Sequence, residues 1–214
     1  MWLRPSLAVA VAAVLLVEAC SGLPRRVASP PVGRPGYDPA ALKLCVAALD
    51  RTVARYALLP DRTFSPGCTA LGSVQLRDVG LPTTNLGAMT CPLGRAYADW
   101  AQNDVQAAAV EHLGARVIRV ESMGTYSCRT INGVPGGRLS EHASANAVDI
   151  AAFVLSDGRR VSVLQGWGGA AEGQFLRAIR AKACRRFRTV LSPDYNAAHR
   201  DHFHFDMGAG GLCS

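Results

Sequence analysis

The sequence has little of what a nucleic-acid-binding protein needs. Aromatic residues make up only 7% of the 214 residues, too few for a platform on which single-stranded bases stack. Lys and Arg (23) outnumber Asp and Glu (16), but they form no long basic run. A nucleic-acid partner is therefore not expected. The net charge of +7 instead suits an anionic partner, such as a membrane surface or an acidic polymer.

Several common catalytic motifs are also missing. The chain contains no HExxH, which excludes a zinc protease site carried on a single helix. It contains no GxSxG, the strained turn that presents a nucleophilic serine. No CxxC is present, so a four-cysteine zinc site has no support. No glycine-rich loop opens a helix in the manner of a phosphate-binding loop. Any chemistry must therefore come from other residues.

The N-terminal segment has the pattern of an export signal. Arg4 precedes an apolar run over residues 7–17, which is shorter than the roughly 20 residues that span a bilayer. We therefore predict a signal peptide over residues 1–20. The sequence around Cys20 resembles a bacterial lipobox, so a lipid on Cys20 could tether the mature chain to a membrane; simple cleavage near Ala19 is the alternative. Residues 21–37 are rich in Pro and Gly and predict an extended tether before a single domain over residues 38–214.

Cysteine usage agrees with export. Apart from Cys20, the chain has six cysteines, at positions 45, 68, 91, 128, 184 and 213. An even number of well-spaced cysteines in an exported chain predicts a disulfide framework, here of three bonds. The sequence allows many pairings of these six. We expect Cys184 to pair with Cys213, which would fix the C-terminus.

Hydrophobic periodicity predicts an α+β fold with a small, mainly antiparallel sheet flanked by helices, in a single disulfide-stapled domain. The predicted helices cover residues 39–59, 90–112 and 170–184. The predicted strands cover residues 74–76, 115–121, 148–155, 160–163, 187–191 and 202–207. A Gly-rich, polar loop over residues 123–141 is long enough to indicate a functional role.

Histidine is concentrated in two segments, and the first also carries a carboxylate. His142 lies seven residues before Asp149, which opens an otherwise apolar strand. A carboxylate in such a strand is partly buried, and a buried charge is costly unless it is paired or binds a metal. Residues 145–147 could turn the chain and bring His142 back towards Asp149. A structural hydrogen bond between these two side chains is the alternative.

The second segment is residues 199–206. Strand alternation places His202, His204 and Asp206 on one face, and Phe203 and Phe205 on the opposite, core-facing side. Four of the five His residues of the chain lie in these two segments. Two imidazoles and one carboxylate suit Zn²⁺ with water at an open fourth position. A pair of strand histidines in a polar cleft is the alternative.

The order of these motifs is similar to that of known zinc peptidases. Ser140-x-His142-x6-Asp149, followed much later by His202-x-His204, resembles the zinc peptidases that cut bacterial peptidoglycan, and the spacing His199-x2-His202-x-His204 looks especially like the murein endopeptidase among them. These are the D-alanyl-D-alanine carboxypeptidases and dipeptidases and the penicillin-insensitive murein endopeptidase. Together with Tyr126-Ser127-Cys128-Arg129 and the full stretch 139–150, the pattern more closely resembles the bacterial extensin-like C-terminal domain family, over roughly residues 40–213.

The resemblance implies site residues as well as a fold. The implied zinc ligands are His142, Asp149 and His204. It also implies a catalytic or substrate-facing role for His202 and His199, and places Arg129 where the dipeptidases carry an arginine that contacts the substrate carbonyl. The Glu-x-x-His pair of the carboxypeptidases is absent, so a glutamate base is not expected.

The expected function is that of an exported, zinc-dependent peptidase that cleaves peptide bonds in peptidoglycan, in the periplasm or cell envelope. Its partners would be the stem peptides or cross-links of peptidoglycan. The alternative is a non-catalytic envelope module that keeps the metal and binds murein or a protein. His202 and Arg129 favour the enzyme, because a binding module needs no such groups beyond its metal ligands.

Overall fold

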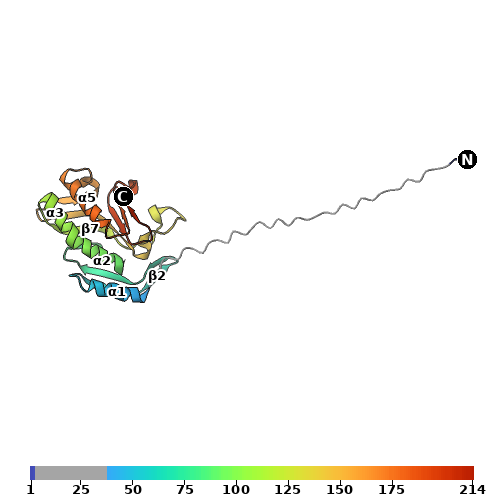
Figure 1. Ribbon diagram of the computed structural model, residues 1–214, viewed down its shortest axis with the longest axis horizontal. Helices are drawn as coiled ribbons and strands as arrows, with labels where there is room; N and C mark the ends of the chain where they lie inside the picture. The colour runs from blue at the N-terminus through green and yellow to red at the C-terminus, as the bar shows by residue number, and fades with distance from the viewer. Residues whose placement is uncertain (3–37) are drawn as a thin grey trace. The chain divides into compact units, whose positions relative to one another are not determined.

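Five α-helices are described in the computed structural model, which covers Met1, Trp2 and residues 38–214. They are α1 (Pro39–Leu49), α2 (Cys91–Asp99), α3 (Gln106–Leu113), α4 (Val163–Gly166) and α5 (Ala171–Ala183). Helix α1 packs against α2, and α3 packs against α5 (Figure 1). The predicted tether, and the signal peptide beyond its first two residues, lie outside the described part of the chain. Within that part, no helix combines the length and the apolar character needed to cross a bilayer.

The long helical segment after residue 90 is confirmed. Helix α2 continues through a π-helical turn, Trp100–Val105, directly into α3. Gly114 ends α3 in the left-handed conformation (φ 66°), which a glycine adopts without a steric penalty. The side chain of Trp100 is buried, and its indole N–H donates to the carbonyl of Ile179 in α5 (3.0 Å). This bond connects the segment to α5.

The first helix is shorter than predicted. It begins as expected, with Asp38 accepting from the backbone N–H of Ala40 (2.9 Å) and proline at the first helical position. It ends at Leu49 rather than at residue 59, and the hydroxyl of Thr52 donates to the carbonyl of Leu49 (2.7 Å). Residues 55–58 instead form strand β1 (Arg55–Leu58), which pairs with β4 (Ser73–Asp78). Sheet pairing therefore decides the conformation of residues 55–58, which the apolar periodicity had assigned to the helix.

The main sheet has seven strands in the order β12-β10-β11-β8-β7-β5, with β9 also pairing with β8. The strands are β5 (Thr83–Thr84), β7 (Val117–Gly124), β8 (Ala147–Leu155), β9 (Arg160–Ser162), β10 (Thr189–Leu191), β11 (Phe203–Asp206) and β12 (Leu212–Cys213). The pairs β5–β7 and β10–β12 are parallel, and the others are antiparallel. The predicted α+β class with a mainly antiparallel sheet is confirmed.

Two smaller antiparallel sheets accompany the main one, and most of their strands were not predicted. The first has the order β1-β4-β6, formed by β1 (Arg55–Leu58), β4 (Ser73–Asp78) and β6 (Met89–Thr90). The second is the hairpin of β2 (Arg62–Ser65) and β3 (Cys68–Ala70). These strands have two to six residues, too short to show a clear alternation in sequence.

Aromatic side chains behind β11 form the centre of the core. Phe203 and Phe205 are fully buried, as the strand alternation predicted. The ring of Phe205 meets the ring of Trp100 edge to face (5.1 Å between centroids) and stacks on Phe187 (4.7 Å). This packing fixes the face of β11 that points away from the core, which carries His204.

Three disulfides join the described cysteines. They are Cys45–Cys91, Cys68–Cys128 and Cys184–Cys213. The predicted framework of three bonds is confirmed, and so is the pairing of Cys184 with Cys213. The first bond connects α1 to the start of α2, the second connects β3 to the loop after β7, and the third connects the end of α5 to β12.

Candidate metal centre

Strand register brings an aspartate and a histidine together. Asp149 on β8 lies directly opposite His204 on β11 in the antiparallel ladder, so both side chains project from the same face of the sheet. On its other side, Asp149 lies opposite Gly124 of β7. A Cβ on Gly124 would meet nothing within 4 Å, so the space next to this position is open.

The third residue, His142, returns to the sheet through a tight turn. It lies in the 3-10 turn Glu141–Ser144, where the hydroxyl of Ser140 accepts from the backbone N–H of His142 (3.3 Å). Ala145 then takes the left-handed conformation (φ 53°), which reverses the chain before β8 begins. The predicted turn over residues 145–147 is confirmed, and it brings the imidazole of His142 to Asp149.

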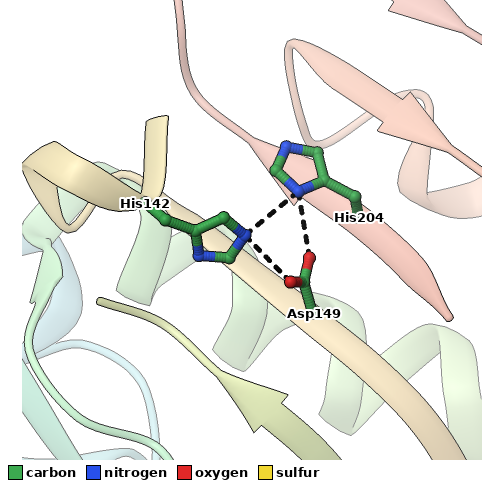
Figure 2. Close-up of side chains that lie close together, drawn as sticks. All are labelled: His142, Asp149 and His204. Carbon is green, nitrogen blue, oxygen red and sulfur yellow. Dashed lines mark hydrogen bonds and ion pairs between the residues drawn. The ribbon is translucent and has the colours of Figure 1, made fainter. Parts of the chain in front are cut away.

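The three side chains converge on one point, as Figure 2 shows. Nε2 of His142 lies 3.0 Å from Oδ2 of Asp149 and 3.2 Å from Nδ1 of His204. Nδ1 of His204 lies 2.9 Å from Oδ1 of Asp149. All three residues are buried, and their facing atoms lie within 4.8 Å of one another. They form a group that could hold a metal ion.

The hydrogen bonds on the far side of each ring fix which nitrogen faces the group. Nδ1 of His142 donates to the carbonyl of Thr125 (2.9 Å), and Nε2 of His204 donates to Oδ2 of Asp206 (3.0 Å). In its neutral form, each ring therefore presents a lone pair to the other ring and to Asp149. Two lone pairs beside a carboxylate repel one another unless a cation lies between them. The donor set thus fits a metal ion, and its outer partners are of the type that orient metal-binding histidines.

The charges within the buried group also favour a cation at this position. Burial would raise the pKa of Asp149, but when the facing nitrogens of His142 and His204 carry protons, their hydrogen bonds and charges hold that pKa well below its usual range. Burial alone would lower the pKa of His204, yet hydrogen bonds to Asp149 and Asp206 raise it to about 9. The surroundings of Asp149 therefore favour a positive charge, which a proton on His204 or a metal cation can supply.

The other predicted site residues lie around this group. Nε2 of His202 lies 3.8 Å from Oδ1 of Asp149, while its Nδ1 donates to Asp201 (2.8 Å). The ring of His199 is centred 5.2 Å from that of His202, and burial and nearby positive charges lower the pKa of His199 to about 4. A guanidinium nitrogen of Arg129 lies 3.7 Å from Oδ2 of Asp149. The structure thus brings all six predicted residues together.

Three groups in the outer layer of the site were not predicted. Asp206 had been placed on the histidine face by strand alternation, but no role was assigned to it. Asp201 orients His202, and its only sequence signal is its position next to that residue. The carbonyl of Thr125 orients His142 across 17 residues of sequence, and no pattern could have identified it.

Replacing Asp206 by Ala is expected to weaken metal binding by about 10–100-fold, the usual effect of losing a carboxylate behind a metal-binding histidine. The ring of His204 would remain but would lose the hydrogen bond that fixes its orientation. Competition with a chromophoric chelator measures the change in affinity. Asp157→Ala is the matched control, because it removes an exposed turn carboxylate that pairs with Arg159. Equal metal affinity in the two variants would refute a role for Asp206.

Comparison with known proteins identifies the family. A family model described as extensin-like protein C-terminus matches residues 43–214, which includes every residue of the site. Searches of curated proteins and of solved structures found no match. The family model covers well over half of the sequence, so the chain belongs to the extensin-like protein C-terminus family.

Proposed function

We propose that the chain is an exported, zinc-dependent peptidase that cleaves peptide bonds in peptidoglycan. The observation that carries this proposal is the position of His202. Its imidazole reaches the edge of the buried His142–Asp149–His204 group without being one of the three converging residues. A site that only holds a metal has no use for an oriented imidazole at that position. The motif resemblance to zinc peptidases of peptidoglycan supports the substrate.

Zinc is the metal that suits the donor set. Two imidazole nitrogens and one carboxylate oxygen are typical of catalytic zinc sites, whereas Mg²⁺ and Ca²⁺ prefer oxygen ligands alone. His142, Asp149 and His204 would hold the ion. When bound, zinc lowers the pKa of a water molecule to about 7 and polarises a carbonyl group.

His202 has the geometry of a group that transfers protons. Because Nδ1 donates to the carboxylate of Asp201, the other nitrogen, Nε2, is free to accept a proton. Nε2 is also the atom that faces Asp149. It can therefore take a proton from an attacking water and return it to the leaving amine, the two transfers that amide hydrolysis requires. His199 has a similar arrangement, with Nδ1 donating to Asn196 (2.8 Å).

Arg129 supplies positive charge at the exposed side of the site. Its side chain is 42% exposed, and its guanidinium lies 3.7 Å from Asp149, so it faces both the buried group and the solvent. Its backbone carbonyl accepts from the N–H of Ser140, which ties the residue to the turn that carries His142. A guanidinium fixed in this position can stabilise the negative charge that develops on a carbonyl oxygen during hydrolysis.

The three disulfides support the proposed location outside the cytoplasm, because such bonds persist in oxidising compartments. Removal of the predicted signal peptide would give a mature chain that begins at Cys20 or close to it. Mass spectrometry of the N-terminal peptide from the cell envelope tests this prediction. An intact Met1 in that fraction would refute export through this segment, and an unmodified Cys20 would refute the lipid tether alone.

Digestion of purified murein tests the proposed activity. The chain is stripped with a chelator, divided, and assayed with and without added zinc; the released fragments are identified by mass spectrometry. We expect new peptide fragments only in the zinc-restored sample. If the zinc-loaded chain sediments with murein but breaks no bond, the non-catalytic binding module replaces the enzyme.

A further inference from the structure

The β2–β3 hairpin is fixed against the loop that follows β7. The ring of Phe64 on β2 packs against the ring of Tyr126 in that loop, with 4.7 Å between centroids. A disulfide joins Cys68 on β3 to Cys128 in the same loop. The hydroxyl of Ser65 also lies 3.4 Å from the sulfur of Cys128. A covalent bond and two side-chain contacts therefore hold the two segments together.

The turn of the hairpin adds a further contact. Gly67 adopts a positive φ of 82°, and a Cβ at this position would lie 2.5 Å from Cδ1 of Leu139. Leu139 belongs to the far end of the same loop, where it forms a bridge with Thr130. The hairpin thus contacts the loop at both of its ends, and the turn accepts no larger residue than glycine without displacing Leu139.

This loop also forms the wall of the metal centre. The carbonyl of Thr125 orients His142, and the N–H of Ser127 donates to the carbonyl of His142 (3.1 Å). Arg129 reaches Asp149 from the same stretch. Tyr126 lies between Thr125 and Ser127, so Phe64 packs directly on the segment that positions a candidate ligand. The hairpin is therefore held rigidly next to the site.

The outer surface of the hairpin combines an aromatic ring with positive charge. Phe64 is 52% exposed despite its contact with Tyr126. Arg62 lies two residues before Phe64 on the same strand and is also exposed, and the ladder has an irregularity between Thr63 and Ser65, at Phe64. Residues 61–70 and 125–141 contain three arginines, Arg62, Arg129 and Arg138, and two carboxylates at their ends, Asp61 and Glu141. Single exposed apolar side chains are common, but this one is held rigidly beside a candidate catalytic centre by a disulfide and an aromatic contact.

We propose that this hairpin binds the glycan strand of peptidoglycan, next to the peptide that the metal centre cleaves. The inference rests on the proposed function and specifies that the chain recognises the sugar part of the substrate. An aromatic face is apolar and electron-rich, so it attracts the C–H bonds of a sugar ring. Arg62 pairs with carboxylates of the same polymer, which suit its forked guanidinium. With three arginines against two carboxylates, the hairpin and its loop carry a net positive charge, which complements an anionic glycopeptide.

Phe64→Ala in the full chain tests the proposal on two substrates. The first is intact murein, and the second is a set of cross-linked stem peptides freed from their sugars by an amidase. We expect the KM for murein to rise about 3–10-fold, the effect of losing one aromatic contact. The kcat for murein, the cleavage of sugar-free peptides and the zinc content should stay unchanged, because the loop contacts His142 through backbone atoms of Thr125 and Ser127 and stays joined to the hairpin by the Cys68–Cys128 bond. Phe64→Tyr should restore the KM, whereas Phe64→Leu, which is apolar but has no ring, should not.

Val110→Ala is the matched control, because Val110 on α3 is also 52% exposed. If Phe64→Ala leaves the KM for murein unchanged while the chain cleaves it, the inference is wrong and the proposed function stands. If Phe64→Ala raises the KM equally on sugar-free peptides, the hairpin binds the peptide rather than the sugars, which also overturns the inference. If the chain cleaves neither substrate but Phe64→Ala weakens its sedimentation with murein, the peptidase proposal fails and the glycan surface stands.

Discussion

Replacing His204 by alanine is expected to release the metal ion and to abolish cleavage of murein at the same time. His204 faces both other members of the group, at 3.2 Å from His142 and 2.9 Å from Asp149. Its loss leaves one imidazole and one carboxylate, too few to hold zinc in a closed geometry. Zinc affinity should therefore fall by more than the roughly 10–100-fold that follows loss of an outer-layer partner.

Metal analysis and murein digestion measure the two effects on the same preparation. His112→Ala is the matched control, because His112 lies on α3 and is the one histidine of the sequence outside the two motifs. It should keep both zinc and activity. Disulfide content and thermal unfolding establish that the His204 variant is folded. A folded variant that retains one zinc per chain would contradict the assignment of His204 as a ligand.

Replacing His202 by alanine is expected to separate chemistry from metal binding. The variant should keep its zinc, because His202 lies at 3.8 Å from Asp149 and outside the three-residue group. It should cleave murein about 10²–10⁴-fold more slowly, the usual contribution of a positioned acid or base. The ratio of kcat to zinc content, measured on wild type and variant, isolates this effect. Loss of zinc in His202→Ala together with its retention in His204→Ala would reverse the two roles.

The helices that could be predicted from the sequence are those with both a periodic stripe and an end signal. The segment that starts at Cys91 ends at Gly114, and α5 lies within one residue of its predicted bounds at both ends. The first helix was predicted to be too long because Val53 and Tyr56 continue its apolar spacing. Pairing of β1 with β4 decides their conformation, and a contact between distant segments leaves no periodic signal in either of them.

The candidate site was predictable to the extent that its residues lie in two short motifs. The spacing from His142 to Asp149 and the alternation around His204 identified candidates, because buried polar groups stand out in apolar strands. The resemblance to zinc peptidases then selected His142, Asp149 and His204 among them. The pairing of β8 with β11, which brings the motifs together, could not be derived from either one. The position of Phe64 depends on the bond between Cys68 and Cys128, a pairing that sequence spacing does not determine.

Anomalous diffraction from crystals of the zinc-loaded chain tests the central claim most directly. Data collected just above and just below the zinc absorption edge locate the ion without reference to activity. We predict a single peak, about 2.0–2.2 Å from Nε2 of His142, Nδ1 of His204 and a carboxylate oxygen of Asp149. A peak coordinated by His199 and His202 instead, or no peak between the three predicted atoms, would contradict the account.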